Sequence, residues 1–182
     1  GIDQVWVQNA VDGDTTDDTD EAITINNIST GVTIGIEGGD SDGSGDNYID
    51  VTPVFSSVTG TSDSASLALK NGKADTVTIA DIETLNVSEN GGTAASDIDS
   101  LSASTATTLN VSATGKGVNI DDITAANLKT VNASGSSAAV SVNVDNSNAT
   151  TTFTGGTGDD TVDFGTANTF TKLDTVDGGG GT

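Results

Sequence analysis

A short segment returns along this chain at nearly constant intervals. TLNVS stands at residues 84–88 and again at 108–112, and TVNAS at 130–134 is a third copy. A threonine precedes each of Leu85, Leu109, Val131, Phe153 and Val176, which follow one another at intervals of 24, 22, 22 and 23 residues. One strand at a fixed interval indicates stacked coils, in which like residues lie above like at about 4.8 Å. We therefore predict an all-β fold, a parallel β-solenoid of the β-roll or β-helix kind, with coils of about 22–24 residues.

Other segments also read as strands. AITINNI (22–28), DTVTIADI (75–82) and AAVSVNV (138–144) alternate small apolar with polar residues, which is the period of a half-buried strand. An antiparallel sandwich is the alternative fold, because its strands also recur at short, regular spacing. A disordered acidic chain is a further alternative, since only 33% of the residues are hydrophobic. The periodic patterning argues against disorder.

The charge of the chain restricts its partners. It has 27 acidic and 5 basic residues, a formal net charge of −22, and no His, Cys or Met. Nucleic acids and anionic membranes would be repelled, and no apolar run is long enough to span a bilayer, so we expect neither as a partner. Such a surface favours bound cations. Without cysteines no disulfide is available, and metal ions are the obvious alternative staple outside the cell.

We expect one continuous β domain over residues 1–182. Its first part, 1–60, reads as an irregular acidic β region, 61–154 as solenoid coils, and 155–182 as a coil that carries a Gly/Asp loop. The chain lacks an initiator Met and ends in DTVDGGGGT, which starts a glycine loop without its aspartate. We interpret it as a fragment of a longer protein that continues beyond residue 182.

A glycine–aspartate nonapeptide stands at residues 155–163. GGTGDDTVD matches the pattern G-G-x-G-x-D-x-U-x, where U is a large apolar residue. Calcium prefers six to eight oxygen ligands, glycines allow positive φ so that carbonyls turn inward, and an aspartate adds a carboxylate. We predict a calcium site formed by Gly155, Gly156, Gly158 and Asp160, with Asp159 as a further ligand or a solvated side chain. The alternative is a simple glycine turn with a solvated face.

Three other segments are candidate calcium loops, so we expect several structural Ca²⁺ ions. The final segment repeats the nonapeptide in part, the segment at 38–50 is a degenerate copy, and the acidic loop at 12–21 begins D-x-D without the EF-hand glycine. For that last loop a solvated acidic surface is equally expected. The candidate ligands are Asp174, Asp177, Gly178 and Gly179; Asp40, Asp42, Asp46 and Asn47; and Asp12 and Asp14.

The chain resembles a known family at this point. The nonapeptide is similar to the RTX (repeats-in-toxin) motif, and IETLNVS, TTLNVSATG and LKTVNASG resemble the C-terminal region of RTX-bearing bacterial surface-layer proteins and related large adhesins. The resemblance implies type I secretion, calcium-dependent folding at the bacterial cell surface, and assembly with copies of itself into a lattice or fibre. The interval from Gly155 to Gly178 is 23 residues, which is longer than the 18 of a simple RTX roll and indicates a wider solenoid.

We therefore expect a structural, calcium-binding protein of a bacterial surface layer and no enzyme. The alternative is an extender or ligand-binding module of an RTX adhesin, with a cell-surface polysaccharide as a possible ligand and Trp6 and Tyr48 as its large aromatics. An enzyme would have to use carboxylate pairs such as Asp97/Asp99 or Asp121/Asp122, which are more often solvated or calcium-bound. An ice-binding ladder is suggested by the threonines in 76–78 and 150–152, but these do not keep one phase.

Overall fold

A computed structural model of the chain describes residues 1–8, 22–38, 49–147, 150–166 and 170–181. These residues form fifteen strands and no helix. The strands are β1 (Gln4–Gln8), β2 (Ala22–Ile28), β3 (Thr33–Glu37), β4 (Asp50–Phe55), β5 (Ser64–Lys70), β6 (Lys73–Thr78), β7 (Thr84–Glu89), β8 (Ser96–Ser102), β9 (Thr108–Ala113), β10 (Val118–Thr124), β11 (Thr130–Asn132), β12 (Val140–Asn143), β13 (Thr152–Thr154), β14 (Thr161–Asp163) and β15 (Thr175–Asp177). Across these ranges no helix is long and apolar enough to cross a membrane.

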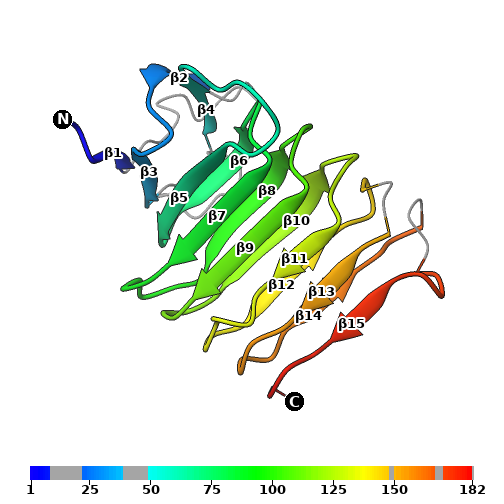
Figure 1. Cartoon of the computed structure of the whole chain (residues 1–182). Coiled ribbons are helices and arrows are strands. Elements are labelled where there is room, and N and C mark those ends of the chain that lie inside the picture. The colour runs from blue at the N-terminus through cyan, green and yellow to red at the C-terminus, as the bar shows by residue number, and fades with distance from the viewer. Residues whose placement is uncertain (9–21, 39–48, 148–149, 167–169, 182) are drawn as a thin grey trace, which may run out of the picture.

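The strands alternate between two parallel sheets. The odd-numbered strands form an eight-stranded sheet in the order β1-β3-β5-β7-β9-β11-β13-β15, which we call sheet A. The even-numbered strands form a seven-stranded sheet in the order β14-β12-β10-β8-β6-β4-β2, which we call sheet B. Each coil thus contributes one strand to each sheet, and the coils stack along one axis (Figure 1). This is the predicted parallel β-solenoid, and the antiparallel sandwich is excluded.

The repeat read from the sequence is the register of sheet A. Thr84 pairs with Thr108, Thr108 with Thr130, Thr130 with Thr152, and Thr152 with Thr175. The predicted coil length is confirmed over these strands, because the paired threonines are the same ones whose spacing in the sequence led to it. Strands β1 to β4 belong to the same two sheets, so the stacked coils begin before residue 61. The sequence had predicted solenoid coils only from residue 61 onward.

The interior is a stack of apolar ladders. Leu85, Leu109, Val131 and Phe153 occupy one position of successive sheet A strands and are at most 2% exposed. Sheet B faces them with its own ladders, which include the buried Ile98, Ile120 and Val142. Short aliphatic side chains suit the interior between sheets A and B. Because the two sheets lie close together, each inward strand position has room for only one side chain.

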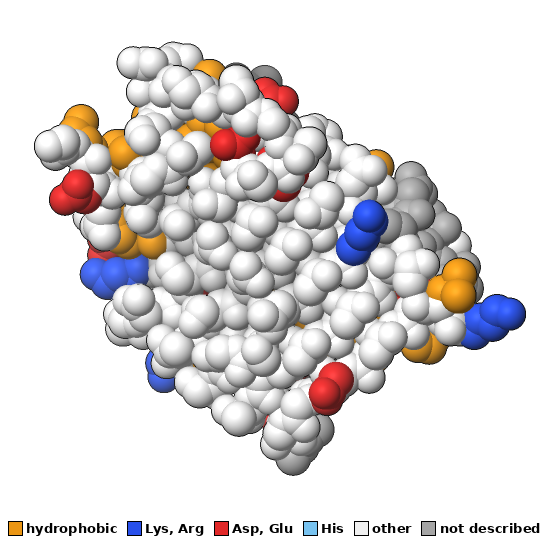
Figure 2. All heavy atoms as spheres, viewed as in Figure 1, with side chains coloured by type: hydrophobic (Ala, Val, Ile, Leu, Met, Phe, Trp, Pro, Cys, Tyr) orange, Lys and Arg blue, Asp and Glu red, His pale blue; other side chains and the backbone are white. Residues whose placement is uncertain are grey.

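The two outer faces differ in charge. From β7 to β13 the outward positions of sheet A are all threonine, asparagine or serine, and Figure 2 shows the middle of the molecule as a broad surface without acidic or basic side chains. The outer face of sheet B carries acidic side chains on β4, β6, β8, β10 and β14. They are Asp50, Asp75, Asp97, Asp99, Asp121, Asp122 and Asp163.

Candidate functional site

The two glycine loops of the C-terminal coils are stacked on each other. Loop 155–160 connects β13 to β14, and loop 178–181 follows β15 in the next coil. The Gly155 N–H donates to the Asp177 carbonyl at 2.7 Å, and the Gly180 N–H donates to the Gly156 carbonyl at 2.7 Å. The structure therefore brings together two candidate loops from successive coils, at the corner where the chain leaves sheet A.

Glycine is required in this corner because successive coils approach backbone to backbone. A Cβ atom at Gly156 would lie 2.1 Å from the Ser136 carbonyl oxygen, and one at Gly158 would lie 2.4 Å from the Ala138 carbonyl carbon. Positive φ was the expected reason, but of the loop glycines described only Gly179 has it, at 72°. Close approach between coils is the physical reason for the glycines of loop 155–160.

Asp160 closes the loop from within. Its Oδ2 accepts the Gly156 N–H at 2.7 Å, and its Oδ1 accepts the Val140 N–H of the preceding coil at 2.9 Å. The side chain is half-buried, whereas Asp159 is exposed. The aspartate of the nonapeptide is therefore a cross-link between two coils.

The two aspartates that flank β15 lie at opposite ends of that strand. Asp177 is exposed, and its Oδ1 accepts the Gly179 N–H at 3.1 Å, so it belongs to the glycine corner. Asp174 precedes the strand, where its carboxylate accepts the Thr151 N–H at 2.8 Å and the Thr171 N–H at 2.7 Å. These backbone hydrogen bonds from Thr151 and Thr171 lower the pKa of Asp174. Sequence proximity had grouped Asp174 with the glycine loop, but the strand separates them.

The donor atoms of the glycine corner are oxygens, the kind of ligand that calcium binds. Calcium selects hard oxygen ligands in flexible geometry, and the corner supplies the carboxylates of Asp160 and Asp177 together with main-chain carbonyls of both loops. Each oxygen of the Asp160 carboxylate accepts one N–H. Because a carboxylate oxygen carries two lone pairs, each of them keeps a lone pair for a further bond. The corner contains no nitrogen or sulfur ligand that would favour a softer metal.

Earlier coils build the same corner with other buried side chains. The Ser136 hydroxyl accepts the Ala113 N–H at 2.9 Å and donates to the Val111 carbonyl at 3.1 Å. Glu89, which is 0% exposed, receives the N–H groups of Gly115 at 3.0 Å, Lys116 at 3.1 and 3.2 Å, and Gly117 at 3.3 Å.

Sequence reasoning missed Glu89 because a lone glutamate at a strand end is an ordinary surface residue. The available signal was its position one coil ahead of the G-K-G segment at 115–117, whose backbone N–H groups can surround a carboxylate.

Three carboxylates converge on the outer face of sheet B. One oxygen from each of Asp97, Asp99 and Asp121 lies within 4.8 Å of the others. Lys73 pairs with Asp97 at 2.8 Å, and the Asn119 amide donates to Asp97 at 3.0 Å and to Asp121 at 2.7 Å. Burial raises the pKa of Asp99, and the neighbouring carboxylates raise it further.

The parallel register of β8 and β10 creates this cluster. Asp97 lies directly opposite Asn119, which sets Asp99 next to Asp121. The sequence suggested these aspartates only as the pairs Asp97/Asp99 and Asp121/Asp122, either for an enzyme or as solvated or calcium-bound groups, and the grouping across coils was not predicted. Asp122, the fourth of them, accepts an amide N–H from Asn146 at 2.7 Å instead.

The remaining candidate ligands lie outside the described residues. They are Asp12, Asp14, Asp40, Asp42, Asp46 and Asn47.

Comparison of the chain with protein-family models, with curated proteins and with solved structures finds no match. The functional argument therefore depends on the geometry of the chain itself, and the resemblance to RTX surface proteins stays a prediction from the nonapeptide.

Proposed function

We propose that this chain is a structural, calcium-binding unit of a secreted bacterial surface protein, and that calcium promotes its folding and its association with further copies. The observation that carries the proposal is the stacking of two Gly/Asp loops from successive coils, with the Asp160 carboxylate held inside the corner. An ion bound there would touch two coils at once. Calcium would therefore stabilise the stacked state over the unfolded chain.

The electrostatics of the chain support the same proposal. A net charge of −22 destabilises any compact state through self-repulsion. The described part of the chain offsets it with the ion pairs Lys70–Glu37 and Lys73–Asp97, and the sequence has too few basic residues to neutralise the rest. Bound divalent cations would reduce the repulsion at the corner and on the acidic face of sheet B, where Asp97, Asp99 and Asp121 converge.

A structural role also suits the way the carboxylates are used. Asp160, Asp174 and Glu89 accept backbone N–H groups that tie one coil to another. In the sheet B cluster, Lys73 and Asn119 hold two of the three carboxylates. Groups engaged in this way stabilise a scaffold, and we propose no catalytic function for them.

Calcium titration of the purified chain tests the proposal. We expect calcium, but not magnesium at equal concentration, to raise the thermal unfolding midpoint followed by circular dichroism. At 100 times the dissociation constant, one site adds about 2.7 kcal/mol. Asp160→Asn should lose most of this calcium-dependent gain, and the exposed neighbour Asp159→Asn should keep it. Sedimentation velocity on the same samples reports association.

Two results would count against the proposal. Equal unfolding midpoints in calcium and in chelator would refute calcium binding by the folded chain. A calcium-stabilised chain that stays monomeric up to high concentration would remove the association part and leave a calcium-stabilised module.

A further inference from the structure

The outer face of sheet A is ordered into columns by the parallel register. The threonine column contains Ser64, Thr84, Thr108, Thr130, Thr152 and Thr175. The asparagine column beside it contains Thr33, Ser66, Asn86, Asn110, Asn132, Thr154 and Asp177. A third column contains Trp6, Gly35, Ala68, Ser88 and Ser112. The threonines of this column do keep one phase, and Thr152 of the segment 150–152 is one of them.

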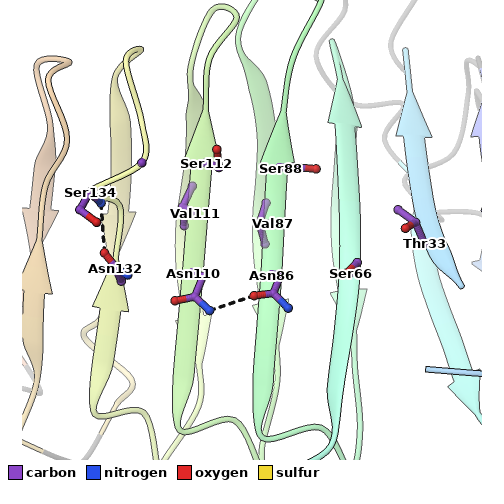
Figure 3. A pocket seen from close by; sticks show the side chains of 11 residues that line it. Thr33, Ser66, Asn86, Val87, Ser88, Asn110, Val111, Ser112, Asn132 and Ser134 are labelled. Carbon is purple, nitrogen blue, oxygen red and sulfur yellow. Dashed lines mark hydrogen bonds between the residues drawn. The ribbon is translucent and has the colours of Figure 1, made fainter. Parts of the chain in front are cut away.

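The asparagine column lines a shallow groove of about 630 Å³ that crosses the strands along the solenoid axis. Its volume falls within the range of small-ligand sites, about 300–1,000 Å³. The groove residues come from β3, β5, β7, β9 and β11 and from the turn after β11, and none of them is charged (Figure 3). They are Thr33, Ser66, Asn86, Val87, Ser88, Asn110, Val111, Ser112, Asn132, Ser134 and Gly135.

The groove retains hydrogen-bonding capacity that the protein does not use. The Asn110 amide donates to Asn86 Oδ1 at 2.8 Å, and Asn132 Oδ1 accepts the Ser134 N–H at 3.1 Å (Figure 3). Within the described residues, the Asn132 Nδ2 group and the hydroxyls of Ser66 and Ser112 have no protein partner. A ligand that lies across the strands therefore meets amide and hydroxyl groups on four successive strands, from β5 to β11.

An aromatic side chain stands at the N-terminal end of the same face. Trp6 occupies the third column, in register with Gly35, and its indole lies over that glycine. A Cβ atom at Gly35 would lie 2.2 Å from the Trp6 ring, so the glycine makes room for the indole. The indole Nε1–H donates to Gln4 at 3.0 Å, which fixes the ring orientation, and the side chain is only half-buried. Part of the ring is thus available for stacking.

We propose that this face of sheet A binds a neutral, linear saccharide, with the asparagine column as hydrogen-bonding floor and Trp6 as stacking platform. Charge decides between ligand classes. An anionic ligand would be repelled by a chain of net charge −22, and a cation would prefer the acidic face of sheet B. An apolar ligand would leave the amides and hydroxyls unpaired. A polyhydroxylated chain satisfies them, and the apolar face of a sugar ring matches an indole.

The saccharide site is independent of the calcium proposal, because none of the groove residues belongs to the glycine corner. Asp177, which ends the asparagine column, lies outside the groove. Its test uses the purified chain in calcium on an array of immobilised neutral oligosaccharides, with sialylated and sulfated glycans as charged controls, followed by titration calorimetry with the best soluble binder. We expect binding to neutral glycans only. Trp6→Ala and Asn132→Ala should each weaken it by about tenfold, the loss of one hydrogen bond or ring contact.

The chain offers a matched control for Asn132. On the outer face of sheet B, Asn143 Oδ1 accepts the Asp145 N–H at 2.8 Å, the same local contact that Asn132 makes with Ser134. Asn143→Ala should leave saccharide affinity unchanged, and thermal unfolding of each variant checks that it folds. Equal losses in Asn132→Ala and Asn143→Ala, or no neutral glycan bound at millimolar concentration, would overturn the proposal. Two further results would overturn it if no glycan binds. One is that the chain shapes ice crystals through the threonine column, and the other is that it self-associates and Asn132→Ala abolishes this association.

Discussion

Replacing Glu89 with alanine should destabilise the solenoid more than any comparable change of a surface carboxylate. Glu89 ends β7 with its carboxylate 0% exposed, and it accepts the N–H groups of Gly115, Lys116 and Gly117 from the next coil. The variant removes the acceptor of three N–H groups at once. It also leaves a space where the side chain stood, because Glu89 is fully buried and lies against Gly115.

The magnitude follows from the exposure of the three donors. A buried N–H without an acceptor costs about 1–3 kcal/mol, and one that water can reach costs less. Gly117 is buried, whereas Gly115 is half-buried and Lys116 is exposed. Taking about 2 kcal/mol for the first and about 0.5 kcal/mol for each of the others gives a loss of about 3 kcal/mol in the free energy of unfolding. Glu89→Gln keeps one acceptor oxygen and should lose about half as much.

Urea unfolding followed by circular dichroism at fixed calcium measures this free energy by linear extrapolation. The matched control is Glu83→Ala, because Glu83 is half-buried and accepts a single N–H, from Asp63 at 2.9 Å. The control should lose under about 1 kcal/mol. The reasoning is refuted if Glu89→Ala and Glu83→Ala are equally stable at an unchanged denaturant slope.

Three further predictions concern the C-terminal coils and the acidic face. Gly156→Ala should destabilise the last coils by about 1–3 kcal/mol, because its Cβ would meet the Ser136 carbonyl. Gly180→Ala should be tolerated, because the nearest atom to its Cβ would lie at 3.6 Å. Hydrogen exchange of the amides in the last coils compares the stability of the two variants. Asp99→Asn should raise the urea midpoint at pH 7 in chelator, since burial and then nearby carboxylates raise the pKa of Asp99; the gain should vanish below about pH 3.9, where both states are protonated. Asp174→Asn should be less stable than wild type at pH 7, because hydrogen bonds lower the pKa of Asp174 in the folded chain. This difference in stability should shrink as the pH falls below about 3.9, and it should vanish once the carboxylate of the folded chain is also protonated.

The architecture of this chain was accessible from its sequence because a solenoid repeats one local pattern. Leu85, Leu109 and Val131, which recur at nearly constant intervals in the sequence, are paired with one another across neighbouring strands of sheet A. A repeat along the chain thus becomes a stack of equivalent side chains in the fold. The fold of the first coils was harder to read. Gln4 pairs with Thr33 and Thr33 with Ser66, and both intervals are wider than those between the later threonines, so the fixed spacing does not extend to β1 and β3.

The functional groups were predicted less well, because they form between coils. Asp97 and Asp121 come together only once β8 and β10 are in register, and the uncharged stretch of sheet A from β7 to β13 appears only once its outward positions are aligned. Asp174 shows the converse, because a strand separates it from residues that are close to it in sequence. It is close to Gly178 in sequence, but a strand extends about 3.3 Å per residue, and the length of β15 carries it to the other corner.

The corner where the chain leaves sheet A shows how calcium would be used along the solenoid. Buried protein groups occupy it in the middle coils, a carboxylate with three N–H partners at Glu89 and a hydroxyl at Ser136. In the last coils the corresponding place holds Asp160, whose oxygens keep free lone pairs, beside glycines and the exposed Asp177. At this corner the middle coils are therefore complete without a metal, and the C-terminal coils are the ones that an ion bound in the corner would stabilise. Under the calcium proposal, chelation should first release the amides of β13 and β15 to hydrogen exchange while those of β7 and β9 stay protected. Simultaneous loss of protection in all four strands would show that calcium acts on the whole solenoid.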